Sequence, residues 1–466
     1  MKAMHVLRQV ASLCLCLLYA ISAFAGEISD VLSWEAFLEM AEKAPLEAEG
    51  RVLDMRGMSV ASYIEKEDAP LRILGDTPLR IVGGDFGYMS ILGGSLILEG
   101  TQVSVIEPDR RTRHSAVLEF CSIDDETPLR LTLTRGTSLS FTSLRVSDGV
   151  TYGRSTVLDM VYISAKDTQV ELINHGAIHG LEAHAIHISP LWELEGELAA
   201  LPHAVRIAIE NTGQIITDGQ GITVRGPVSA GSCDVSIHNS GKISGDDGGV
   251  DISHYDHGDD SDEPVFLRYS SRLHNSGEIF SRCENWGEES GAVAFSFNGE
   301  EGGADGEYIA EILNEGIVHA EKDKAIAVTM IAMQAKGSID IRQDGTLQSY
   351  ADPWFMEDYE DEDGILTDIL LHLELGSRES LYDIRYHGVG EALRYPILLD
   401  YSTFDDWFVE GHGYTPAQAR EKADEVWEAL LENGLPENVP VRMLIGYWNI
   451  YEGQAPIYPY GEERVR

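Results

Sequence analysis

The densest group of potential ligand side chains is an acidic run that begins at residue 256. It holds five carboxylates in eight residues, namely Asp256, Asp259, Asp260, Asp262 and Glu263. Calcium prefers oxygen ligands of this kind. We therefore take these five residues as a candidate ligand-binding site, with Asp256, Asp259, Asp260 and Asp262 as calcium ligands. The spacing is not that of an EF-hand, and acidic runs are also typical of solvated loops. We expect either no cofactor or calcium.

Histidines provide a weaker metal signal. His254 and His257 flank the first carboxylate of the acidic run, and His184 lies three residues before His187. Imidazole suits zinc and copper. If the segment around His187 is a strand, its isoleucine neighbours point inward and His187 faces solvent. A solvent-exposed histidine without a metal is the alternative interpretation.

A repeated motif predicts the framework that positions these groups. An apolar run is followed by Asn, any residue, Gly, any residue and an aliphatic residue. The motif begins at Asn174, Asn211, Asn239, Asn275 and Asn314 and, in degenerate form, at Gln343. Recurrence at intervals of this length indicates a solenoid built from stacked units.

The unit from residue 205 to 224 indicates what one repeat looks like. Short apolar runs at 205–209, 214–216 and 222–224 predict three strands, separated by bends at 211–213 and 218–221. Three strands and three bends describe one coil of a parallel β-helix. We expect the Asn side chains to stack as an amide ladder and the Gly residues to supply left-handed backbone at the bend.

The repeats differ in length, and the extra residues fall in one place. They separate the third strand of a coil from the first strand of the next, at 189–203, 226–232, 253–265 and 298–306. Stacking would gather these loops on one side of the solenoid, where repeat proteins usually bind.

The two ends of the chain differ from the repeats. Residues 1–25 have Lys2 and Arg8, an apolar stretch and a small-x-small ending at Ala25, as expected for a secretory signal peptide. Ser33 and an apolar stripe from Trp34 predict a capping helix within 26–46. We assign 47–400 to the β-helix and 401–466 to an α/β tail with a helix after Thr415.

Composition excludes several functions. The chain has 34 Lys and Arg against 78 Asp and Glu, a formal net charge of −44. This charge repels nucleic acid and anionic lipid, and no apolar run beyond the signal is long enough to span a membrane. Beyond the signal, Cys121, Cys233 and Cys283 are too few for a disulfide scaffold. Cys233 and Cys283 could bridge neighbouring coils, or all three could be isolated apolar residues.

The repeat region resembles the passenger regions of bacterial autotransporters and filamentous adhesins. Their coils follow Asn-x-Gly-x-Ile with Gly-Ile-x-apolar, which Gly221-Ile222-Thr223-Val224 and Gly249-Val250-Asp251-Ile252 match. The resemblance covers roughly residues 170–350 and implies an all-β, right-handed parallel β-helix on a secreted or cell-surface protein, with the periplasm as another location. Because the final residues predict a helix, we expect no C-terminal membrane barrel. The resemblance implies no catalytic residue.

Enzymes of the β-helix fold provide an alternative. Those that cut polygalacturonate use Asn-Thr-Asp, paired Asp and Gly-His-Gly in close order. Here Gly213 follows Asn211-Thr212, and Asp246-Asp247 lies far from Gly411-His412-Gly413. Paired carboxylates on neighbouring coils could still hydrolyse a neutral glycan.

These observations support three hypotheses about function. The leading one is an exported, non-enzymatic, adhesin-like or surface-structural module that binds a glycan or protein partner at the cell surface through its loops. The second is a glycoside hydrolase or lyase of the same fold. The third is a filament component that self-associates through its coil ends.

Overall fold

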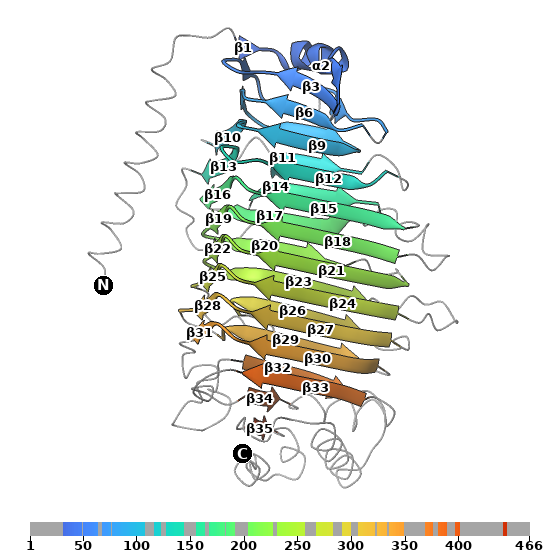
Figure 1. The fold of residues 1–466 in the computed structure, drawn as a ribbon, viewed down its shortest axis with the longest axis vertical. Helices are drawn as coiled ribbons and strands as arrows, with labels where there is room; N and C mark the ends of the chain where they lie inside the picture. The colour runs from blue at the N-terminus through green and yellow to red at the C-terminus, as the bar shows by residue number, and fades with distance from the viewer. Residues whose placement is uncertain are drawn as a thin grey trace, which may run out of the picture.

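The computed structural model describes most of the chain between residues 31 and 348 and four strands beyond it (Figure 1). Within the first range it omits 49, 64–67, 76, 108–115, 123–126, 144–154, 164–166, 182, 192–203, 227–230, 257–266, 283–290, 300–305, 322–323 and 333–334. The later strands cover 369–375, 381–388, 397–400 and 441–444. The predicted signal peptide and the predicted tail helix lie outside the described residues.

The described residues form a parallel β-helix with three long sheets, as predicted. Sheet A contains β1 (Val31–Leu32), β4 (Ser59–Val60), β7 (Asp85–Phe86), β10 (Gln102–Glu107), β13 (Ser138–Ser143), β16 (Ala177–Leu181), β19 (Gln214–Thr217), β22 (Lys242–Gly245), β25 (Glu278–Ser281), β28 (Ile317–Ala320) and β31 (Thr346–Gln348). Sheet B contains β2 (Leu46–Glu47), β3 (Gly50–Asp54), β6 (Leu79–Val82), β9 (Ser95–Glu99), β12 (Leu129–Leu133), β15 (Thr168–Asn174), β18 (Ala204–Asn211), β21 (Ser232–Asn239), β24 (Leu267–Asn275), β27 (Gly306–Asn314), β30 (Ala335–Gln343) and β33 (Leu381–Gly388). Sheet C contains β5 (Leu71–Arg72), β8 (Met89–Leu92), β11 (Ala116–Cys121), β14 (Ser155–Tyr162), β17 (Ala183–Pro190), β20 (Gln220–Arg225), β23 (Gly248–Asp256), β26 (Val293–Gly299), β29 (Ile326–Ala332), β32 (Ile369–Leu375), β34 (Ile397–Asp400) and β35 (Val441–Leu444).

Each complete coil passes through sheets B, A and C in that order, as β18, β19 and β20 do (Figure 1). Side chains alternate between core and solvent along each strand. In β18, Val205, Ile207 and Ile209 are buried, whereas Arg206 and Glu210 are exposed. Parallel pairing keeps the register from coil to coil, so the inward aliphatic residues form continuous columns through the core.

The four long connections join the sheets as predicted, but the strands extend further into them than expected, since β17 continues to Pro190, β23 to Asp256 and β26 to Gly299. Each leaves sheet C and enters sheet B, before β18, β21, β24 and β27. Because neighbouring strands lie beside one another in both sheets, the four connections begin and end at the same corner of the solenoid.

The predicted amide ladder is confirmed at the corner between sheets B and A. The Nδ2 atoms of Asn174, Asn211, Asn239 and Asn275 each donate to the Oδ1 of the Asn in the next coil at 2.7–2.8 Å. Asn314 Nδ2 donates to Gln343 Oε1 at 3.0 Å. The Asn side chains are fully buried. The ladder therefore satisfies polar groups that would otherwise be costly to bury.

The reason for the Gly two residues after each Asn differs from the prediction. None of these glycines has positive φ. A Cβ on Gly213 would lie 2.1 Å from the carbonyl oxygen of Gly176, and one on Gly277 would lie 2.1 Å from that of Gly241. Consecutive coils approach so closely here that only Gly fits.

A capping helix covers the first coil, as predicted. Helix α2 (Trp34–Glu42) begins after Ser33, whose side chain accepts a hydrogen bond from Ala36 N at 3.2 Å. Phe37 is fully buried, with its ring centre 5.3 Å from that of Phe86. The helix thereby covers apolar surface at the N-terminal end of the core. At the other end, β34 and β35 extend sheet C beyond β32.

The ladder predicts a specific loss of stability. Replacing Asn239 with Ala removes the acceptor of Asn211 Nδ2 and the donor to Asn275 Oδ1. We expect Asn239→Ala to lower the free energy of unfolding in urea by roughly 2–3 kcal/mol. Ser240→Ala, at the exposed neighbouring position, should change it by less than about 0.5 kcal/mol. Equal effects of the two substitutions would contradict this account.

Candidate functional site

The structure describes only the start of the predicted acidic site. Asp256 is the last residue of β23, where it pairs with Gly299 of β26. Asp259, Asp260, Asp262 and Glu263 lie outside the described residues. Calcium binding by this run therefore stays a prediction. Among the described residues, no group of three or more His, Cys, Asp or Glu side chains is placed to hold a metal.

The candidate histidine ligands separate into different environments. His254 lies in the core, with its ring stacked between Tyr269 and Phe297 at centre distances of 4.9 and 5.1 Å. It is therefore a core residue and not a surface ligand beside the acidic run. His187 points outward, as predicted, and its Nδ1 lies 3.0 Å from Asp159 Oδ1. His184 Nδ1 accepts a hydrogen bond from the backbone N–H of Gln220.

The cysteine alternatives are also resolved in part. Cys233 is a free thiol, which favours the alternative of isolated cysteines over a bridge to Cys283. Its side chain is fully buried in sheet B, and burial raises the pKa of the thiol. Cys121 is also free, and burial followed by nearby Glu119 and Asp159 raises its pKa. Thiols whose pKa is raised are poor nucleophiles. Cys283 lies outside the described residues.

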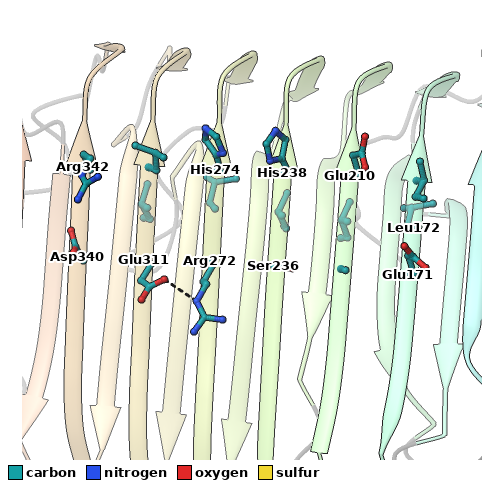
Figure 2. Close-up of a pocket in the computed structure, with 17 residues that line it drawn as sticks. Glu171, Leu172, Glu210, Ser236, His238, Arg272, His274, Glu311, Asp340 and Arg342 are labelled. Atoms are coloured by element: carbon teal, nitrogen blue, oxygen red, sulfur yellow. Dashed lines mark hydrogen bonds and ion pairs between the residues drawn. The ribbon is translucent and has the colours of Figure 1, made fainter.

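A more extensive feature lies on the outer face of sheet B. An open depression there, which we call the sheet B strip, crosses six successive strands, β15, β18, β21, β24, β27 and β30 (Figure 2). Two rows of register partners supply its outward side chains. The first row is Glu171, Ala208, Ser236, Arg272, Glu311 and Asp340. The second row is Ile173, Glu210, His238, His274, Leu313 and Arg342.

One opposite-sign pair lies within the strip, and two further pairs join strip residues to side chains outside it. Arg272 Nε lies 2.8 Å from Glu311 Oε2, and Arg272 Nη1 lies 3.9 Å from Asp234 Oδ1. Glu171 pairs in the same way with Arg130 at 3.3 Å. Such half-exposed pairs contribute only about 0–1 kcal/mol each to stability. Their main effect is to hold long side chains in fixed positions on the surface.

Two histidines lie side by side in the second row. His238 and His274 are on adjacent strands, and their ring centres are 4.5 Å apart (Figure 2). His274 Nε2 lies 2.8 Å from Glu315 Oε2. Glu210 is the register partner of His238 on the other side. An acid and two imidazoles thus occupy three successive coils.

The strip offers hydrogen-bond donors and acceptors over a long path, interrupted by apolar side chains. This arrangement suits non-covalent binding of an extended ligand. The sequence analysis did not identify these residues. A signal was present, because the residue immediately before each Asn or Gln of the repeat lies in the second row, at positions 173, 210, 238, 274, 313 and 342. Aligning the repeats on their Asn and Gln residues therefore predicts the second row of the strip.

Comparison with known proteins identifies no relative. No family model, no curated protein and no solved structure matches the chain. In the described part of the chain, no helix has the length and apolar character needed to cross a membrane.

The buried His254 predicts a stability that depends on pH. Burial lowers its pKa from the ordinary value of 6.5 to about 3, so the unfolded chain binds the proton more readily. Neutral His254 therefore contributes fully to the free energy of unfolding above pH 6.5, and this contribution is lost as pH falls from 6.5 toward 3. Relative to a His254→Phe variant, the wild-type free energy of unfolding should fall by about 2 kcal/mol between pH 7 and pH 5.

Urea titrations at both pH values measure this difference. The comparison uses the change with pH and not the absolute stability, so altered packing of the Phe side chain does not affect it. A His175→Phe variant, changed at a partly exposed position outside the core, is the control for the His-to-Phe substitution itself. Parallel pH profiles for wild type and His254→Phe would contradict the assignment.

Proposed function

We propose that this chain is an exported, adhesin-like binding module that holds an extended, neutral glycan along the sheet B strip. The observation that carries the proposal is the continuity of the strip over six successive coils. Export is expected from residues 1–25, and the repeat resembles adhesin passengers. The destination is the cell surface or the medium, with the periplasm as another location.

The geometry of the coils favours a polymer. Parallel strands lie about 4.8 Å apart, a rise comparable to the length of one sugar residue in an extended chain. Register-equivalent positions, although occupied by different side chains, therefore recur at about the repeat of the ligand. Carboxylates at Glu210 and Glu311 accept hydrogen bonds from hydroxyl groups, and Arg272 and Arg342 donate them.

The overall charge restricts the partner. A formal net charge of −44 opposes binding of acidic polysaccharides and nucleic acid. Neutral glycans carry no such penalty. The four long connections enter sheet B at the starts of β18, β21, β24 and β27, so the loops predicted as a contact face border the strands that carry the strip. The strip crosses these strands near their other ends, so we assign glycan binding to the strip, and the contact face expected at the loops stays a prediction.

A matched pair of variants tests the proposal. Arg272→Ala removes a guanidinium from the strip, whereas Arg268→Ala removes one from the same strand outside it, where it pairs with Glu307. On a glycan array followed by titration, we expect Arg272→Ala to weaken binding of the best neutral ligand about tenfold, or about 1.4 kcal/mol. Arg268→Ala should bind as the wild type does.

The array result also bears on the acidic run. Binding that is lost in chelator and restored by calcium would implicate the segment from Asp256 to Glu263. Binding only to proteins, or to no glycan at all, would reject the glycan proposal. Equal weakening by both arginine variants would assign the effect to net charge and not to the strip.

A second candidate function, glycoside hydrolysis, has one observation in its favour. Glu119 of β11 and Asp159 of β14 are register partners on the outer face of sheet C. Adjacent strands place such carboxylates at about the 5 Å separation found in retaining glycosidases. Asp159 also contacts His187, and Ser90 Oγ donates to Glu119 Oε2 at 3.1 Å.

Release of reducing ends discriminates between the two functions. The binding proposal predicts no release from any neutral glycan bound by the wild-type protein. A hydrolase would release them, and Asp159→Asn and Glu119→Gln would each reduce the rate roughly 100-fold or more. Asp251→Asn is the control, because Asp251 lies in the same row but its register partners are Thr223 and Ala294.

A further inference from the structure

We propose that His238 and His274 form a site for one divalent transition-metal ion, with Cu²⁺ or Zn²⁺ as the natural choices. The two imidazoles project from adjacent strands β21 and β24 at register positions that face each other. Figure 2 shows them side by side on the outer face of sheet B, on the surface of the strip. The site is independent of whether a glycan binds there.

The separation of the rings matches that needed for chelation. With a metal–nitrogen distance of about 2.0–2.1 Å, two imidazoles that bind one ion at roughly 90–110° have ring centres about 4.5–5.2 Å apart. The ring centres of His238 and His274 are 4.5 Å apart, with an angle of 68° between the ring planes. The backbone therefore already holds the pair at the required distance.

A carboxylate beside His274 would hold that imidazole in position as a metal ligand. Glu315 Oε2 accepts a hydrogen bond from His274 Nε2 at 2.8 Å. This bond leaves Nδ1 as the metal-binding nitrogen and orients the ring, as in carboxylate–histidine–metal arrangements. Glu210 is the register partner of His238 on the neighbouring strand, but among the described residues no third side chain is placed to join the two imidazoles as a ligand. Water would complete the coordination.

The surroundings favour a cation. The formal net charge of the chain is −44, which raises the local concentration of positive ions. Two imidazoles select transition metals over calcium and magnesium, which prefer oxygen ligands. For such a site, Cu²⁺ should bind more tightly than Zn²⁺.

Calorimetric titration of the full chain with Cu²⁺ tests the site. The protein is purified without a histidine tag, treated with chelator and titrated in excess Ca²⁺, which occupies surface carboxylates. We expect one saturable site per chain, lost in His238→Ala and in His274→Ala. Glu315→Gln should weaken binding about 10–100-fold. His175→Ala is the matched control, since it removes a partly exposed imidazole that contacts Thr212 instead of another histidine.

A spectroscopic measurement avoids any dependence on substitution. Electron paramagnetic resonance of the wild-type protein with one equivalent of Cu²⁺ should show coordination by two imidazole nitrogens. Unchanged binding in the His238→Ala/His274→Ala double variant, or no saturable site in the wild type, would overturn the proposal. Neither the calorimetric nor the spectroscopic experiment contains glycan. A negative result for the metal site is therefore separate from a negative result for glycan binding.

Discussion

The whole structure depends on parallel hydrogen bonding between successive coils. Each coil uses the backbone N–H and C=O groups of its neighbours, so none of its strands is satisfied alone. Because this pairing is in register, it copies every side-chain position from one coil to the next. The core columns, the amide ladder and the surface rows are three consequences of the same constraint.

Inside the solenoid, this pairing places apolar side chains along the strands and polar side chains at the corner between sheets B and A. Aliphatic columns remove apolar area from water, and each fully buried Ile or Val contributes about 1.5–3 kcal/mol. The corner between sheets B and A cannot be apolar, because the backbone turns there and leaves polar groups. The stacked Asn amides satisfy one another and also the backbone: Gly176 N–H, for example, donates to Asn174 Oδ1 at 3.1 Å. The close approach of coils at this corner then excludes any side chain on the following Gly.

On the outside, the same register produces linear arrays of functional groups. Six successive strands align their outward residues in the two rows of the sheet B strip. Register also creates pairs that a sequence does not place together. His238 and His274 are 36 residues apart in the chain, and Glu119 and Asp159 are 40 apart, yet both pairs are neighbours on adjacent strands. An imidazole pair and a carboxylate pair therefore arise from coil length.

The sequence by itself determined the coil. Asn-x-Gly motifs and alternating aliphatic residues are local patterns, and they predicted the strands of β18, β19 and β20, the Asn ladder, the helix after Ser33 and the corner where the long connections lie. Local patterns predict which residues face the core, because successive side chains along a strand point to opposite faces. The tertiary structure alone decided which side chains meet across coils. It placed His254 in the core, left Cys233 as a free thiol, and assigned the role of each repeat Gly to close packing and not to positive φ. It also assembled the sheet B strip. These outcomes depend on the register between coils of unequal length, and register is a property of the stacked backbone that no single repeat contains.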